Sequence, residues 1–132
     1  MEILNFLNNY YRDQDNFYIG ILNRTNKHFY QYKHNIVSMS KYMNTLKYYN
    51  KNNKDIYISL NTFNKESDKR TKLNIKDIKS IFFDIDIDAD TIKDNIIKEL
   101  GIPTFVIQTS SNKYQLIYQL KTTMANSNKI KI

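Results

Sequence analysis

Apolar and polar residues follow two different periods along this chain, which divides it into short helices and short strands. Apolar residues at helical spacing predict amphipathic helices over residues 2–11, 38–50 and 90–100. Alternating or continuous apolar runs predict strands over residues 17–22, 28–32, 55–63, 81–88, 104–109 and 114–120. Residues 121–132 lack apolar periodicity and are expected to fray. This mixture predicts one α/β domain of the α+β kind, in which helices flank a mixed β-sheet.

Residues with capping or helix-ending chemistry define the expected ends of the helices. Ser38 and Asp90 are expected to be the N-caps of the second and third helices, and Asn74 to cap a single turn over residues 75–79. Gly101 and the proline two residues beyond it are expected to end the third helix. The apolar stripes expected to be buried are Met39, Tyr42, Met43, Leu46 and Tyr49 in the second helix and Ile92, Ile96 and Leu100 in the third.

The most informative segment is Ile81 to Asp90, an apolar run that becomes a regular alternation of carboxylates. Side chains of a strand alternate between its faces, so Asp84, Asp86 and Asp88 would share one face. Clustered carboxylates repel one another, and a bound hard cation such as Mg²⁺ or Mn²⁺ relieves that repulsion. The segment is therefore a candidate metal site, and a solvated acidic strand end balanced by nearby lysines is the alternative.

Composition narrows the class of protein. The 132 residues are 41% apolar and include 11 tyrosines and 7 phenylalanines, which is typical of a folded domain rather than a disordered chain. The lack of cysteine excludes disulfides, thiolate zinc sites and a cysteine nucleophile. No run approaches the roughly 18 apolar residues of a membrane span, and the first residues do not form the apolar core of a signal peptide. A cytoplasmic location is the expectation.

The net charge of +7 comes entirely from the first part of the chain. Residues 1–80 carry 14 lysine and arginine residues against 7 acidic residues, whereas residues 81–132 carry six of each kind. This division suits a surface for polyanions beside the acidic segment, and a lysine-rich solubilising surface is the alternative. The candidate contacts to nucleic-acid phosphates in the polar loop are Lys65, Lys69, Arg70 and Lys72. A plain solvated loop would carry the same residues.

The acidic segment, the Gly101-Ile102-Pro103 start of a strand and the Thr109 to Gln115 turn together resemble the archaeo-eukaryotic primase superfamily, above all the RepB-type primases and primase-polymerases of plasmids, phages and other mobile elements. The resemblance covers roughly residues 55–120. It implies a primase-like fold with a partial RRM-like half. It also implies a nucleotidyltransferase dependent on Mg²⁺ or Mn²⁺, which synthesises primers in DNA replication from a single-stranded DNA template and nucleoside triphosphates.

The resemblance also implies roles for individual residues. Asp84 and Asp86 match the family's Asp-x-Asp motif and would be catalytic metal ligands, with Asp88 as an auxiliary ligand. Gln115 holds the position of the family's nucleotide-contacting residue, which is usually histidine. Glutamine can position a phosphate but cannot neutralise its charge. The other residues expected to contact the nucleotide are Ser110, Ser111 and Lys113.

One departure from the family pattern concerns the third acidic residue, which lies on a later strand in the family. Residues 116–132 contain no Asp or Glu. Either Asp88 or an upstream acid takes its place, or the domain is cut short at its C-terminal side and catalytically impaired. A partial sheet would also leave a free edge for a protein partner or for self-association.

Two classes of function therefore remain open. The first is a primase-like nucleotidyltransferase of a mobile element. The second is a primase-fold protein without catalysis, which binds nucleic acid or a protein partner as a replication accessory or as an inhibitor of a host defence or polymerase complex. The missing third carboxylate favours the second class, whereas Asp84, Asp86, Ser110 and Gln115 favour the first.

Overall fold

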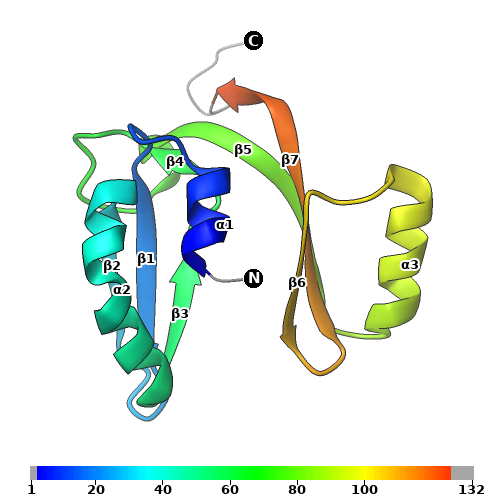
Figure 1. The fold of residues 1–132 in the computed structure, drawn as a ribbon, viewed down its shortest axis with the longest axis horizontal. Coiled ribbons are helices and arrows are strands. Elements are labelled where there is room, and N and C mark those ends of the chain that lie inside the picture. The colour runs from blue at the N-terminus through cyan, green and yellow to red at the C-terminus, as the bar shows by residue number, and fades with distance from the viewer. Residues whose placement is uncertain (1–2, 126–132) are drawn as a thin grey trace. The chain divides into compact units, whose positions relative to one another are not determined.

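The computed structural model describes residues 3–125 of the chain (Figure 1). Within that range, three α-helices and two antiparallel sheets confirm the predicted α+β class. The chain packs as two compact units, unit 1 over residues 3–78 with Ala125, and unit 2 over residues 79–124. The expectation of one domain stays a prediction. No helix in the described range is both long enough and apolar enough to cross a bilayer.

Unit 1 is built on a three-stranded antiparallel sheet in the order β2-β1-β3. Its strands are β1 (Phe17–Asn23), β2 (Phe29–His34) and β3 (Lys54–Ile58). The first two form the predicted hairpin, in which Phe17 pairs with His34 and Leu22 with Phe29. The third pairs with the free side of β1, so that Gly20 lies opposite Tyr57. Side chains of directly paired residues point to the same face, so this register decides which residues lie together.

The helices of unit 1 are α1 (Ile3–Tyr10) and α2 (Ile36–Lys51). Tyr11, directly after α1, stacks on Phe17 with ring centroids 4.1 Å apart. Tyr42 of α2 stacks on His34 at 4.8 Å. Because Phe17 and His34 are paired in the hairpin, both helices cover the same face of the sheet. The buried residues of this core include Leu7, Tyr10, Phe17, Ile19, Ile21, Met39, Met43 and Leu46.

Tyr11 also ties the end of α1 to the segment after β3. Its phenol donates a hydrogen bond to the carbonyl oxygen of Ser59. Burial raises the pKa of Tyr11 well above the ordinary value of 10.0, and the nearby Tyr10 and Asp15 raise it further. The phenol therefore stays protonated and remains a donor at physiological pH.

The N-cap of α2 is Asn35, and the prediction of Ser38 as the cap is wrong. Ser38 is the third residue of the helix, and the two side chains form a capping box. Asn35 Oδ1 accepts from the Ser38 amide at 2.9 Å, and Ser38 Oγ accepts from the Asn35 amide at 3.0 Å. Of the predicted stripe, Met39, Met43 and Leu46 are buried. The two tyrosines of the stripe are half-buried.

The predicted strand over residues 55–63 is two strands, β3 and β4 (Thr62–Phe63). Ser59 ends the first, because its amide donates to the Tyr18 carbonyl at 3.0 Å while its hydroxyl accepts from the Tyr18 amide at 2.9 Å. A side-chain acceptor thus replaces the backbone acceptor that a continued strand would supply. β4 then pairs with a different strand, through Thr62 opposite Asp77.

The single turn predicted over residues 75–79 is also wrong. The turn lies earlier, as the 3-10 helix η1 (Lys72–Asn74) with Thr71 at its N-cap. Residues 75–79 instead begin the long strand β5 (Ile75–Ile85), because they pair with β4. The apolar spacing of this segment suits both a helix and a strand, and pairing with the neighbouring strand makes it a strand.

Unit 2 contains the second part of β5, followed by a helix and a hairpin (Figure 1). These elements are α3 (Ala89–Leu100), β6 (Phe105–Ser110) and β7 (Lys113–Ala125). The second sheet has the order β4-β5-β7-β6, so the hairpin joins β5 through β7. Its core consists of Ile85, Ala89 and Leu116, with Phe83, Ile96, Ile97, Tyr114 and Tyr118 packed around them.

Three predictions about unit 2 need correction. The N-cap of α3 is Asp88, with left-handed backbone angles, whereas Asp90 lies in the first turn of the helix. Ile92 and Leu100 are 39% and 58% exposed, because the helix turns Ala89 and the isoleucines at 96 and 97 toward the sheet. Residues 121–125 continue β7 rather than fraying, while the fraying predicted for residues 126–132 falls outside the described residues. The predicted end at Gly101 is confirmed, with φ of 88° and its amide bonded to the Ile97 carbonyl.

His34 gives unit 1 a pH-dependent stability. Burial lowers the pKa of its imidazole below the ordinary value of 6.5, and Nδ1 lies 3.1 Å from the Ser38 hydroxyl. The unfolded chain then takes up this proton at a higher pH than the folded chain does. The free energy of unfolding should therefore fall as the pH drops below about 6.5.

Urea denaturation at about pH 8 and about pH 5 measures this loss. We expect a smaller loss in His34→Gln than in wild type, because glutamine does not titrate. His28→Gln is the matched control, since His28 is exposed on the same hairpin, and it should keep the wild-type loss. An equal loss in all three proteins would contradict the role of His34.

Candidate functional site

The carboxylate predicted to lead the metal site, Asp84, lies on the face of unit 2 opposite α3. Its neighbours along β5, Phe83 and Ile85, pack on the core beneath α3. Side chains of a strand alternate, so Asp84 points away from α3, and it is exposed. The face opposite the helix therefore carries this carboxylate at the end of β5.

Gln115 lies on the same face. The residues on either side of it in β7, Tyr114 and Leu116, belong to the core beneath α3, so the half-buried Gln115 points to the opposite face. Because β5 and β7 are neighbours in the sheet, Asp84 and Gln115 share one face of two adjacent strands. This placement follows from the core contacts alone, and the roles expected for the two residues stay predictions.

The other two predicted ligands lie outside the strand. β5 ends at Ile85, so Asp86 follows the strand and Asp88 lies at the cap of α3. The predicted alternation through Asp88 is therefore wrong, because a left-handed residue with φ of 47° turns the chain into the helix. Both carboxylates are exposed. Within residues 3–125, no group of three or more Asp, Glu, His or Cys side chains is gathered as a metal site.

The predicted nucleotide-contacting turn is the tip of the β6–β7 hairpin. Ser110 pairs with Lys113 across it, and Ser111 and Asn112 form the two-residue turn. Asn112 has φ of 62°, a left-handed conformation that asparagine tolerates better than most residues. The side chains of Ser110, Ser111 and Lys113 are exposed, so the hairpin places hydroxyls and an ammonium two strand positions from Gln115.

In unit 1, the basic loop of residues 64–71 is fastened to the sheet face that the helices leave open. The Lys33 ammonium donates to the carbonyl oxygens of Lys65 and Ser67. The buried Tyr18 hydroxyl lies 3.1 Å from Ser67 Oγ. Lys33 and Tyr18 are directly paired in the hairpin, so both reach the loop from the same face.

The four predicted phosphate contacts differ in their surroundings. Arg70 donates from Nε to the Gln31 side-chain oxygen, which holds its guanidinium over the sheet. Lys65 and Lys69 are exposed on the loop, and Lys72 is exposed in η1. Only Arg70 of these four lines the pocket described next.

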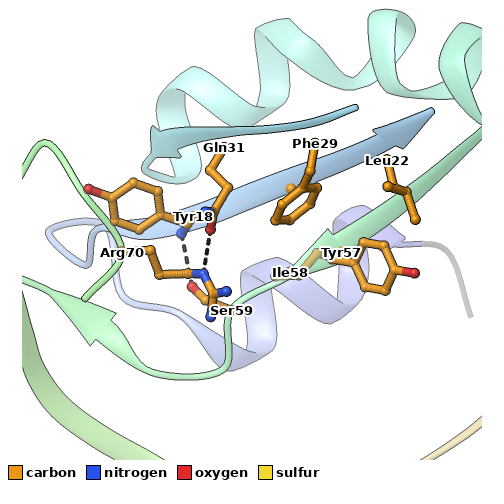
Figure 2. Close-up of a pocket in the computed structure, with 9 residues that line it drawn as sticks. Tyr18, Leu22, Phe29, Gln31, Tyr57, Ile58, Ser59 and Arg70 are labelled. Carbon is orange, nitrogen blue, oxygen red and sulfur yellow. Dashed lines mark hydrogen bonds between the residues drawn. The ribbon is translucent and has the colours of Figure 1, made fainter. Parts of the chain in front are cut away.

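A pocket of about 470 Å³ lies on the open face of the β2-β1-β3 sheet (Figure 2). Its walls include Phe29, Tyr57 and Arg70, and the last two lie toward opposite ends of the group drawn in Figure 2. Phe29 and Tyr57 are 42% and 52% exposed, and their rings are perpendicular with centroids 6.1 Å apart. The remaining lining residues are Tyr18, Gly20, Leu22, Gln31, Ile58 and Ser59.

The absence of a side chain at Gly20 makes room for the Phe29 ring. A Cβ atom built on Gly20 would lie 2.5 Å from Phe29 Cζ and 2.6 Å from Cε2, inside van der Waals contact. The ring therefore lies across the strand where a larger residue would stand. Glycine inside an apolar strand commonly marks such a close approach.

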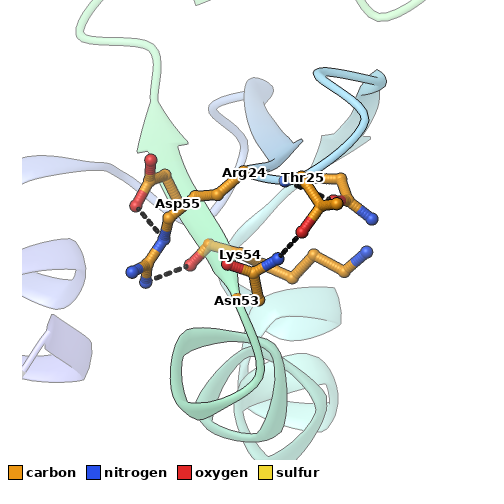
Figure 3. A network of polar contacts seen from close by, with 6 residues as sticks. Arg24, Thr25, Asn53, Lys54 and Asp55 are labelled. Atoms are coloured by element: carbon orange, nitrogen blue, oxygen red, sulfur yellow. Dashed lines mark hydrogen bonds and ion pairs between the residues drawn. The ribbon is translucent and has the colours of Figure 1, made fainter.

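A polar network lies where the turn after β1 meets the start of β3 (Figure 3). Arg24 Nε lies 3.0 Å from Asp55 Oδ1, and the same guanidinium donates to the Lys54 carbonyl at 3.4 Å. Asn53 donates to the Thr25 hydroxyl beside them. Asp55 is paired with Leu22 and shares its face, so Arg24 neutralises the carboxylate nearest this end of the pocket. The cationic end is the one at Arg70.

The aromatic pocket is the site that the sequence pattern did not identify. Two signals for it were present, namely Gly20 inside an apolar strand and an aromatic residue at both Phe29 and Tyr57. The missing information was the register, which places these three residues together only when β2 and β3 both pair with β1. No family model, curated protein or solved structure matches this chain. The evidence for the two candidate sites, the face that carries Asp84 and Gln115 and the aromatic pocket, therefore comes from their residues and their geometry.

Proposed function

We propose that this chain is a primase-like nucleotidyltransferase domain, with its nucleotide site on the face of unit 2 opposite α3. The single observation that carries the proposal is the placement of Asp84 and Gln115 on one face of adjacent strands. One face of the sheet thereby carries a carboxylate suited to a divalent cation and an amide suited to a phosphate. The hydroxyls and the ammonium of the neighbouring hairpin suit the remaining phosphate oxygens.

The donor set suits Mg²⁺ or Mn²⁺. Asp84 and Asp86 offer hard oxygen ligands, and Mg²⁺ in nucleotide enzymes is commonly held by one or two carboxylates with the substrate phosphates completing its shell. When bound, such ions stabilise the charge that develops in nucleotidyl transfer. Asp84 and Asp86 would hold the cation, Gln115 would orient the triphosphate, and Lys113 would supply positive charge to it. Asp88 as a ligand stays a prediction.

A second function is binding without catalysis, as a primase-fold protein that engages nucleic acid or a protein partner. The observation that favours it is the position of Asp88 at the helix cap, away from the alternation of β5. The face of unit 2 opposite α3 then carries Asp84 within β5, and Asp86 follows the end of that strand. In this case Asp84 and Asp86 would be dispensable for binding.

Primer extension on a single-stranded DNA template, with labelled deoxynucleotides and Mn²⁺, tests the first function. We expect the double variant Asp84→Asn/Asp86→Asn to lose about 100-fold or more of product formation, because bound metal ions contribute several kcal/mol to such reactions. The matched control is Asp90→Asn/Asp94→Asn, which removes two exposed carboxylates from α3. The control should retain wild-type activity.

Equal product from wild type and from Asp84→Asn/Asp86→Asn would contradict the enzymatic proposal, and so would a wild type without product. Binding of the template should be measured in parallel with both variants. Template binding that survives in a protein without activity would support the second function instead.

A further inference from the structure

We propose that the aromatic pocket of unit 1 binds an unstacked base of a single-stranded nucleic acid, with the adjacent phosphate toward Arg70. The pocket proposal rests on the proposed function in one respect, because a primase-like enzyme would use a single-stranded template. The site, its residues and its chemistry lie in unit 1, whereas the nucleotide site proposed above lies in unit 2.

Two aromatic rings are exposed inside the concave pocket. Phe29 and Tyr57 keep 42% and 52% of their surface open although both line the pocket. Their perpendicular planes offer a flat face and an edge to one ligand. Every nucleobase has a flat π-face, and stacking on an aromatic side chain is the common way to hold an unpaired base.

The strand beneath the Phe29 ring holds that ring in place. The ring lies over Gly20, where any larger residue would displace it, and the strand backbone supports it from below. A ring already placed on the sheet loses little further freedom when a ligand stacks on it. Such preorganisation favours binding.

Charge is distributed unevenly around the pocket. At one end, Gln31 holds the Arg70 side chain at the pocket wall, and Lys69 is exposed next to it in the chain. At the other end, Arg24 neutralises Asp55. The loop also carries Glu66 and Asp68, but both are exposed and neither lines the pocket. The pocket thus has aromatic walls and one cationic end, which complements a base joined to a phosphate.

A single strand fits this arrangement better than a duplex. In a duplex both faces of each base are stacked on neighbours, so extrusion into a pocket costs a few kcal/mol. An unpaired base requires no such extrusion. We therefore expect the protein to bind a single strand more tightly than the duplex of the same sequence.

The test is fluorescence anisotropy with a labelled oligothymidylate of about twelve nucleotides, without metal or nucleotide. We expect Phe29→Leu and Tyr57→Leu each to weaken binding about 5- to 100-fold, because leucine keeps an apolar side chain but removes the stacking face. Gly20→Ala should weaken binding in the same direction, since it displaces the Phe29 ring while leaving its chemistry intact. Arg70→Gln should lower the dependence of binding on salt, because one phosphate contact is lost.

The matched control is Tyr30→Leu. Tyr30 is 45% exposed and adjoins Phe29 in β2, but it points to the other face of the sheet and does not line the pocket. Tyr30→Leu should bind oligothymidylate as tightly as wild type does. Thermal unfolding followed by circular dichroism shows whether each variant is folded. If one pocket variant is unfolded, the comparison of Gly20→Ala with Tyr30→Leu still decides the proposal.

A second ligand separates stacking from charge. An abasic oligomer of the same length keeps the phosphates but has no bases, so wild type should bind it more weakly than oligothymidylate, and Phe29→Leu should bind it as wild type does. The proposal is overturned if the folded pocket variants bind oligothymidylate as tightly as Tyr30→Leu does, or if the abasic oligomer binds wild type equally well. The proposal is also overturned if the wild-type protein does not bind oligothymidylate. A pocket that holds a peptide instead of a base would give this result.

The outcomes for the two proposals are distinguishable. Primer extension that depends on Asp84 together with unchanged binding by the pocket variants would refute the pocket proposal alone. Loss of binding in the pocket variants together with no primer extension would refute the enzymatic proposal alone. Neither set of variants changes residues of the other site.

Discussion

Replacement of Phe17 with alanine is expected to lower the free energy of unfolding by about 3–5 kcal/mol. Phe17 is fully buried, and its ring stacks on Tyr11 with an angle of 15° between the planes. Removal of the ring leaves a cavity between the sheet and the end of α1, at the point where Tyr11 also holds the segment after β3. A loss of this size is a large part of the stability of most small proteins.

Urea denaturation followed by circular dichroism and tyrosine fluorescence measures this loss, since the chain has no tryptophan. Phe17→Leu should cost less than Phe17→Ala, because it fills most of the volume. Phe29→Ala is the matched control for removing a phenyl ring, since Phe29 is partly exposed and stands on the opposite face. A loss from Phe17→Ala no greater than that from Phe29→Ala would contradict the placement of Phe17 in the core.

Replacement of Leu116 with alanine is expected to cost about 2–5 kcal/mol, and its effect should appear first in unit 2. Leu116 is fully buried, and among the described residues its core cluster holds two other buried residues, Ile85 and Ala89. Few neighbours are available to fill the cavity. Amide hydrogen exchange should therefore lose protection along β6 and β7, and the face that carries Asp84 and Gln115 should lose its fixed arrangement.

Hydrogen exchange read by mass spectrometry on peptides from residues 104–120 would measure this loss. Ile102→Ala is the matched control, because Ile102 is 89% exposed close to the same hairpin and its replacement should change stability by less than about 0.5 kcal/mol. Unchanged protection in Leu116→Ala, or equal effects of the two replacements, would show that Leu116 does not hold the hairpin.

The elements that the sequence predicted well are those in which periodicity and turn chemistry agree. The β1–β2 hairpin, α1 and the end of α3 at Gly101 belong to this group. The errors arose where two residues could perform the same task. Asn35 and Ser38 are both good N-caps, and only the reciprocal capping box assigns them. Asp88 and Asp90 presented the same choice at α3, and the hydrogen bond from the Ile92 amide to the Asp88 carbonyl, which opens the helix, decides it.

The candidate sites differ in how far the sequence could predict them. The face that carries Asp84 and Gln115 depends on alternation within two strands, which is a local property, and both residues lie on it, whereas their role at a nucleotide site stays a prediction. The aromatic pocket depends on the pairing of β1 with two partners and on a loop fastened by Lys33 and Gln31. Such long-range pairing has no counterpart in the spacing of residues along one segment.

The contact between Gly20 and the Phe29 ring has a consequence for evolution. The two positions compete for one space on the sheet, so they are not free to vary independently. In related sequences, a side chain at position 20 should accompany a small residue at position 29, and an aromatic residue at position 29 should accompany glycine at position 20. Related proteins that lack Gly20 should therefore also lack the Phe29 ring, and with it the aromatic wall of the pocket.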